Sequence, residues 1–235
     1  MSYELNNIKA MVFDFDYTLA DSSKGVVQCI RYAQGQMGLP LSSDEEILPT
    51  IGLSVGDTLA KLSGERERDR VDEFARLFLV KADEVMSDCT EVYDSVPATF
   101  AHLQSNQLRI GIASTKYRYR IEAILGRKGL SGFVDVVVGA EDVTEHKPHP
   151  ACLLQAARHF GLPPASVLYV GDSLPDAGAA QRGGLPFVAV LTGHTAAADF
   201  GSYAPLAIFD GIAELPHWVD RFRFSGNGNS AMGTH

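Results

Sequence analysis

Residues 9–18 read Lys-Ala-Met-Val-Phe-Asp-Phe-Asp-Tyr-Thr, so a short apolar run ends in two carboxylates, Asp14 and Asp16. The apolar run, residues 9–13, has the length and composition of a strand that is buried between two layers of helices. A carboxylate at the end of such a strand can attack phosphorus, and a second carboxylate can protonate the leaving oxygen and later activate water. The same residues also suit an acidic loop that only caps a strand, so the rest of the chain decides between the two readings.

Strand-like and helix-like segments alternate along much of the chain. The predicted strands are residues 9–13, 108–113, 133–138, 166–170 and 187–191. The predicted helices between them are residues 97–106, 117–129, 149–160 and 175–183. Such alternation predicts an α/β fold with a Rossmann-like parallel sheet.

Residues 22–90 interrupt this alternation, because they contain no predicted strand. Their helical patterns lie around residues 23–36, 54–63 and 66–87. We interpret residues 22–90 as an inserted helical cap, hinged near residues 20–22 and 92–95. The catalytic core is then expected to consist of residues 1–21 and 91–224, and the tail of residues 225–235, rich in Gly, Asn and Ser, is expected to be flexible.

Composition narrows the kinds of partner. The formal net charge of −9 argues against nucleic acid, which is bound by clusters of lysine and arginine. No apolar run has the length of a membrane-spanning helix, and Cys29, Cys89 and Cys152 lack the spacing of a zinc site or a disulfide framework. We therefore expect a cytoplasmic protein, a monomer or homodimer, that acts on a small phosphorylated metabolite and binds neither nucleic acid nor membranes.

Ser114, Thr115 and Lys116 directly follow the predicted strand 108–113. A hydroxyl group, together with the backbone N–H groups that open the next helix, can hold phosphate oxygens. A Ser/Thr helix cap is an equally good reading of these residues by themselves.

Lys147 lies just before the predicted helix 149–160, between His146 and Pro148. A fixed ammonium group lowers the repulsion between an attacking carboxylate and a phosphate dianion. By itself, however, the pattern also suits a solvated surface lysine.

Asp172 and Asp176 follow the predicted strand 166–170, four residues apart. Two carboxylates at a strand end suit Mg²⁺, which prefers carboxylate oxygens, water and substrate phosphate as ligands. The alternative is a turn with a helix-capping aspartate, but that reading leaves the other three groups unexplained.

These four groups, in this order and each at a strand end, resemble the motifs of the haloacid dehalogenase superfamily over about residues 8–217. The resemblance implies that Asp14 is the nucleophile, that Asp16 is the general acid and base, and that Ser114 and Lys147 assist catalysis. It implies that phosphate is bound by Ser114, Thr115, Lys116 and Lys147. It also implies Mg²⁺ as the cofactor, bound by Asp14, the Asp16 backbone carbonyl and Asp172, with Asp176 and Thr18 beside these groups.

Residue choices within the superfamily favour a phosphatase. Asp16 is present, whereas dehalogenases of this type lack it, and Val55 follows Gly52-Leu53-Ser54 where related mutases carry an arginine. The segments 114–116 and 147–190 look most like phosphoglycolate phosphatases. The sequence therefore predicts a Mg²⁺-dependent phosphatase that hydrolyses a small, phosphoglycolate-like monoester through an aspartyl-phosphate.

Three alternatives remain open at this stage: a pyrophosphatase, a sugar-phosphate mutase and a non-catalytic phosphate-binding module. The substrate is also open, because Tyr17 stands where the family usually has glycine and suits a packing residue as well as a substrate contact. Several cations are candidates for binding a substrate carboxylate, namely Lys24, Arg31, Lys61 and Arg118.

Overall fold

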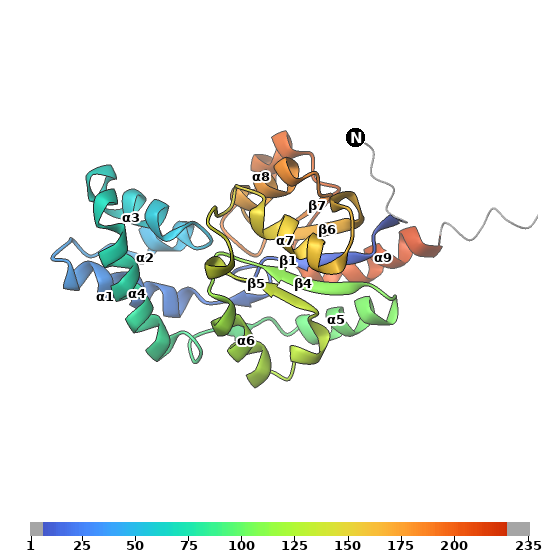
Figure 1. Cartoon of the computed structure of the whole chain (residues 1–235), viewed down its shortest axis with the longest axis horizontal. Helices are drawn as coiled ribbons and strands as arrows, with labels where there is room; N and C mark the ends of the chain where they lie inside the picture. The colour runs from blue at the N-terminus through green and yellow to red at the C-terminus, as the bar shows by residue number, and fades with distance from the viewer. Residues whose placement is uncertain (1–6, 225–235) are drawn as a thin grey trace, which may run out of the picture.

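Six parallel strands form one sheet, in the order β5-β4-β1-β6-β7-β8, in the computed structural model, which describes residues 7–224 (Figure 1). The strands are β1 (Ala10–Phe13), β4 (Arg109–Ala113), β5 (Val136–Val138), β6 (Val167–Gly171), β7 (Phe187–Val190) and β8 (Ala207–Phe209). The acidic strand β1 is central and pairs with β4 on one side and β6 on the other. This sheet confirms the predicted α/β fold.

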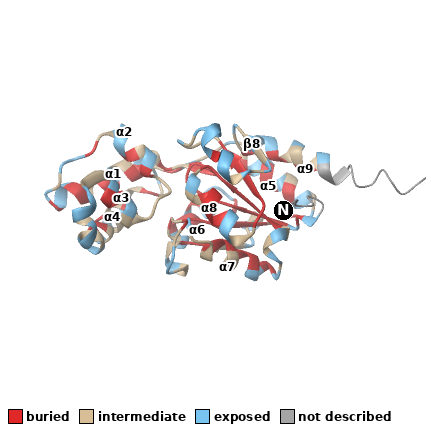
Figure 2. Cartoon of the chain, turned by 90° about the horizontal axis from the view of Figure 1, so that it is seen from above, coloured by how far each residue is buried: buried red, intermediate tan, exposed pale blue. Residues whose placement is uncertain are grey.

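Helices cover both faces of the sheet. One face packs against α5 (Val96–Ser105), α6 (Arg118–Arg127) and α9 (Leu215–Phe224), and the other against α7 (Ala151–Phe160) and α8 (Leu174–Gly183). Successive residues of β1 alternate between the two cores: Met11 and Phe13 belong to the first, Ala10 and Val12 to the second. The strands are therefore buried on both faces, as Figure 2 shows, which explains their continuous apolar sequence.

The inserted segment lies to one side of the sheet and has a hydrophobic core of its own (Figure 1). It consists of α1 (Ser23–Gln36), α2 (Asp44–Ile47), α3 (Val55–Ser63) and α4 (Val71–Val85), with short 3₁₀ helices at Leu48–Thr50 and Glu65–Arg70. Its ends meet in a short antiparallel ribbon, β2 (Ala20–Asp21) with β3 (Glu91–Val92). The ribbon lies where the sequence predicts the two hinges.

Two predicted elements begin later than expected. The helix predicted at 66–87 becomes α-helical only at Val71, because residues 65–70 form a 3₁₀ helix. In that geometry residues three apart lie on one face, and Arg68–Glu65 and Arg70–Glu67 form ion pairs of 2.7 and 3.1 Å. The strand predicted at 133–138 begins at Val136, after a 3₁₀ turn over residues 131–133.

Among the α-helices and strands within residues 7–224, β2, α2, β3, β8 and α9 have no counterpart in the predictions. All of these except α9 have two to four residues, which is too short for a periodic pattern to form. Cys29 and Cys152 are buried, Cys89 is half-buried, and all three cysteines are free. No helix within residues 7–224 is long and apolar enough to cross a membrane, and the predicted tail at 225–235 lies outside the described residues.

Candidate active site

The carboxyl ends of β1, β4 and β6 bring three of the predicted groups together. Asp14 follows β1, Ser114 follows β4, and Asp172 follows β6. Because β4 and β6 are the two neighbours of β1, these residues share one edge of the sheet, where parallel sheets place their ligands. All three side chains are buried.

Lys147 links two of the carboxylates. Its Nζ lies 2.9 Å from Asp14 Oδ2 and 2.6 Å from Asp176 Oδ1, and all three side chains are almost fully buried. Burial opposes the charged form of Lys147, but Asp14 and Asp176 outweigh it and hold the lysine pKa above its usual value. The predicted lysine is therefore a fixed cation beside the predicted nucleophile and not a solvated surface residue.

Asp176 holds this lysine in place. Its Oδ1 accepts hydrogen bonds from Lys147 and from the Tyr169 hydroxyl (2.8 Å), and its Oδ2 accepts from the backbone and hydroxyl of Ser173. A Cβ on Gly171 would lie 2.6 Å from Asp176 Cβ, so only glycine allows this close approach. The sequence did not indicate Tyr169 as a site residue, because a tyrosine inside an apolar strand is typical of a hydrophobic core.

Asp172 faces Thr18, whose hydroxyl donates a 2.9 Å hydrogen bond to Asp172 Oδ1. Burial, followed by repulsion from Asp176 and Asp14, raises the pKa of Asp172 well above its usual range. Burial likewise raises the pKa of Asp14 to about 6, against the attraction of Lys147. Asp14, Asp172 and Asp176 together therefore carry more negative charge than Lys147 can neutralise at this strand edge.

These residues fit a magnesium ion. Oxygens of Asp14, Asp172 and Asp176 lie within 4.8 Å of one another, and Asp14 Oδ1 is buried without a hydrogen-bond partner among residues 7–224. A buried carboxylate oxygen without a partner, close to other carboxylate oxygens, suits Mg²⁺, because this ion prefers oxygen ligands. Since both oxygens of Asp176 are engaged by Lys147, Tyr169 and Ser173, Asp14 and Asp172 are the side chains best placed to hold the ion.

The Asp16 side chain has different partners. Asp16 Oδ1 accepts hydrogen bonds from the Ser22 hydroxyl (2.6 Å) and from Lys116 Nζ (2.9 Å). The carboxylate therefore belongs to the boundary between sheet and insertion, since Ser22 precedes α1. Neither Ser22 as a partner of Asp16 nor the ion pair with Lys116 was expected, because both depend on how the insertion returns to the core.

The predicted phosphate-binding segment 114–116 divides its side chains among several partners. Ser114 is buried at the strand edge, the Thr115 hydroxyl donates to Gly52 O (3.3 Å), and Lys116 pairs with Asp16. The N–H group that opens α6, Arg118 N, donates to the Glu141 carboxylate at 3.0 Å. The expectation that this helix start binds phosphate is therefore wrong for Arg118 N, because a protein carboxylate already caps it.

A sequence model of the haloacid dehalogenase-like hydrolase family matches residues 11–190. The chain belongs to that family. It is 27% identical over 222 residues to a phosphoglycolate phosphatase of Nitrosococcus oceani, covering 92% of this chain and 99% of the relative. It is also 29% identical over 212 residues to a phosphoglycolate phosphatase of Yersinia pestis, covering 88% and 91% of the two chains.

A solved structure of a haloacid dehalogenase-like hydrolase from Bacteroides fragilis is 38% identical and superposes with a TM-score of 0.85. The match covers 88% of this chain and 99% of that one. The resemblance inferred from the four motifs is thus confirmed, and the chain is a hydrolase with the fold of this family.

Tyr17 takes an unusual conformation in this haloacid dehalogenase-like hydrolase. Its φ is +60°, in the left-handed region that glycine occupies readily and other residues rarely. The side chain is nearly buried; its ring meets the His194 ring edge-on at 5.1 Å, and its hydroxyl lies 3.2 Å from His194 Nε2. Both residues line a hollow beside Asp172, so Tyr17 packs under the insertion and also borders the site.

Core helix α6 anchors the insertion of this hydrolase through Arg120, a residue that no pattern in the sequence indicated. Its guanidinium donates to Asp83 Oδ1 (2.7 Å) and to Leu79 O (3.1 Å), both on α4. The Tyr119 hydroxyl donates to the same Asp83 oxygen at 2.6 Å. These contacts hold the insertion over the strand edge that carries Asp14 and Asp16.

Proposed function

We propose that this hydrolase is a Mg²⁺-dependent phosphatase that cleaves a small phosphate monoester through an aspartyl-phosphate on Asp14. The observation that carries the proposal is the state of the Asp14 carboxylate. One oxygen is 2.9 Å from the buried Lys147 ammonium, and the other is buried without a partner among the described residues. Such a carboxylate is held in place for attack and for contact with a cation.

The chemistry divides into two displacements at phosphorus. In the first, an Asp14 oxygen forms a bond to phosphorus while the bond from phosphorus to the leaving oxygen breaks, and Asp16 gives a proton to that oxygen. In the second, Asp16 takes a proton from water, the water oxygen bonds to phosphorus, and the bond to Asp14 breaks. Inorganic phosphate leaves and Asp14 returns to its starting form.

Other residues of the chain prepare the site for these steps. Lys147, oriented by Asp176 and Tyr169, offsets the repulsion between Asp14 and the phosphate dianion. We assign Ser114, which is buried at the same edge, the role of donating a hydrogen bond to a phosphate oxygen. Asp14 and Asp172 would hold Mg²⁺, which would neutralise charge on the phosphate and on both carboxylates.

The relatives support a monoester as the substrate, since both curated proteins named above are phosphoglycolate phosphatases. Asp16 also supports hydrolysis over simple phosphate binding, because a binding module has no use for a proton donor at the leaving oxygen. Pyrophosphate and sugar phosphates remain the compounds to compare with simple monoesters.

The test is to trap the intermediate. Wild-type protein mixed with ³²P-labelled p-nitrophenyl phosphate and Mg²⁺, then quenched in acid, should retain label on the protein. Borohydride reduction and peptide mapping should place the modification at residue 14. Asp14→Asn should show neither label nor turnover, whereas the exposed control Asp199→Asn should retain both. Turnover in Asp14→Asn at the wild-type rate would refute the proposal.

A further inference from the structure

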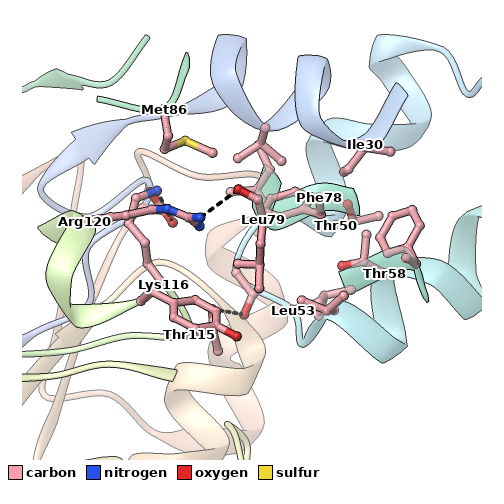
Figure 3. Close-up of a pocket in the computed structure, with 17 residues that line it drawn as sticks. Ile30, Thr50, Leu53, Thr58, Phe78, Leu79, Met86, Thr115, Lys116 and Arg120 are labelled. Atoms are coloured by element: carbon pink, nitrogen blue, oxygen red, sulfur yellow. Dashed lines mark hydrogen bonds and ion pairs between the residues drawn. The ribbon is translucent and has the colours of Figure 1, made fainter. Parts of the chain in front are cut away.

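A cavity opens beside Asp16, between the insertion and the core. Its volume is about 80 Å³, enough for several water molecules. Residues of core and insertion line it together, with Thr115 and Lys116 at the core end (Figure 3). Asp16 also lines it. A leaving oxygen that receives its proton from Asp16 must lie within hydrogen-bond reach of that carboxylate. The cavity therefore offers the carbon attached to this oxygen a space beside Asp16.

The insertion gives the cavity an apolar wall. Side chains from α1, α4 and the loop before α3 point into it, among them Ile30, Leu53, Phe78, Leu79 and Met86 (Figure 3). Leu53, Phe78 and Leu79 belong to the insertion and are only half-buried, so they offer apolar surface that a ligand can cover. Covering such surface is favourable in proportion to the area removed from water.

The cations at this cavity are already neutralised. Lys116 pairs with Asp16 at 2.9 Å, and Arg120 pairs with Asp83 at 2.7 Å. Within residues 7–224, no other lysine or arginine lines the cavity. A carboxylate placed here would lose its water and would have to compete with Asp16 or Asp83 for one of these two cations, which is unfavourable.

The candidate cations from the sequence have partners elsewhere. Lys24 pairs with Glu91, Arg31 with Asp44, and Arg118 with Asp142, while Lys61 donates to Pro49 O. None of them lines the cavity. Within residues 7–224, the structure therefore offers the carboxylate of phosphoglycolate no lysine or arginine at this cavity that is not already paired with a carboxylate.

We propose that the substrate's alcohol is uncharged and apolar, and that its hydrocarbon part fills this cavity during the reaction. The inference rests on the proposed phosphatase function and adds the substrate class to it. A phosphate ester of a short aliphatic or aromatic alcohol meets both requirements, because its phosphate reaches Asp14 while its carbon chain reaches Leu53 and Phe78.

A series of n-alkyl phosphates from ethyl to hexyl tests the proposal. Their leaving alcohols have similar acidity, so differences in kcat/KM report burial of the chain and not the chemistry of cleavage. We expect kcat/KM to rise about threefold to fourfold per methylene until the cavity is full. Phosphoglycolate should be hydrolysed less efficiently than propyl phosphate, which has a similar size.

Two leucine-to-asparagine variants locate the effect. Leu53→Asn introduces a polar group into the cavity wall and should reduce the dependence on chain length to less than twofold per methylene. Leu53 is not part of the insertion's hydrophobic core, so the variant is expected to fold, which circular dichroism would check. Leu41→Asn is the matched control, since Leu41 is 63% exposed, belongs to the same insertion and does not line the cavity.

The outcomes separate the two claims. A flat series, or a preference for phosphoglycolate, would overturn the apolar substrate class while leaving the phosphatase proposal intact. Equal loss of chain-length dependence in Leu53→Asn and Leu41→Asn would overturn the assignment to this cavity. Failure to hydrolyse any monoester, p-nitrophenyl phosphate included, would overturn the phosphatase proposal and the substrate class with it.

Discussion

Replacing Lys147 with methionine removes the ammonium group but keeps most of the side-chain volume. The exposed fractions of the Lys147, Asp14 and Asp176 side chains are 1%, 2% and 0%, so no solvent takes the place of the lost cation. We expect Lys147→Met to abolish turnover and to destabilise the fold, because two carboxylates are left buried at the strand edge.

The size of the effect follows from the distances. At an effective dielectric constant of about 20, each contact is worth roughly 6 kcal/mol of attraction. Much of this is recovered when Asp14 takes up a proton, since burial already raises its pKa to about 6. Breaking a buried ion pair typically costs about 3–5 kcal/mol, which for a chain of this size lowers Tm by roughly 6–20 °C.

Urea unfolding followed by circular dichroism measures this loss directly. Lys24→Met is the control, because Lys24 and Glu91 form a 2.9 Å ion pair in which both side chains are about 70% exposed. That variant should unfold at nearly the same urea concentration as the wild type, because exposed ion pairs contribute little to stability. Adding Asp176→Asn to Lys147→Met should restore part of the stability, since one uncompensated charge disappears. If Lys147→Met unfolds within about 1 kcal/mol of wild type, the reasoning about this buried network is wrong.

Three further predictions concern proton transfer, metal and the insertion. Asp16→Asn should lower kcat/KM for ethyl phosphate about 10²–10⁴-fold but for p-nitrophenyl phosphate far less, because nitrophenolate leaves without a proton and kcat/KM reports the first displacement. Equal losses of kcat/KM would contradict the acid role. EDTA should abolish activity and Mg²⁺ restore it, whereas Asp172→Asn should need much more Mg²⁺; full activity in chelator would exclude the metal. Hydrogen bonds from Tyr119 and Arg120 lower the pKa of Asp83. The contact therefore stabilises the protein fully at pH values above the usual aspartate pKa. This stabilisation is lost as the pH falls through the lowered pKa that Asp83 has in the folded protein. Asp83→Asn should therefore speed proteolysis at the β2–β3 ribbon at neutral pH, and an unchanged cleavage rate would argue against this anchor.

The residues at strand ends were predictable because they depend on local pattern and on one topological rule. The pattern of an apolar run followed by a carboxylate or hydroxyl predicted that Asp14, Ser114 and Asp172 lie at strand ends. Parallel pairing of these strands then places the three residues at the same edge of the sheet. Lys147 needed the resemblance to a family, since its own sequence context does not separate a buried lysine from a surface one.

The remaining contacts depend on tertiary packing. Tyr169 touches Asp176 because β6 and α8 fold back on each other, and Arg120 reaches Asp83 across 37 positions of sequence. No periodic pattern reports such pairings. The left-handed conformation of Tyr17 was likewise not predicted, although the sequence showed that Tyr17 replaces the usual glycine.

The central place of β1 has a consequence for how the chain is made. Its residue Ala10 pairs with Arg109 and Val167, which follow it by 99 and 157 positions. A ribosome therefore releases β1 well before its two sheet partners, whereas the insertion's core between Val26 and Met86 is complete early. We expect nascent chains that end near residue 100 to carry a folded helical unit beside an unpaired apolar strand. Such exposed apolar strands are what chaperones bind.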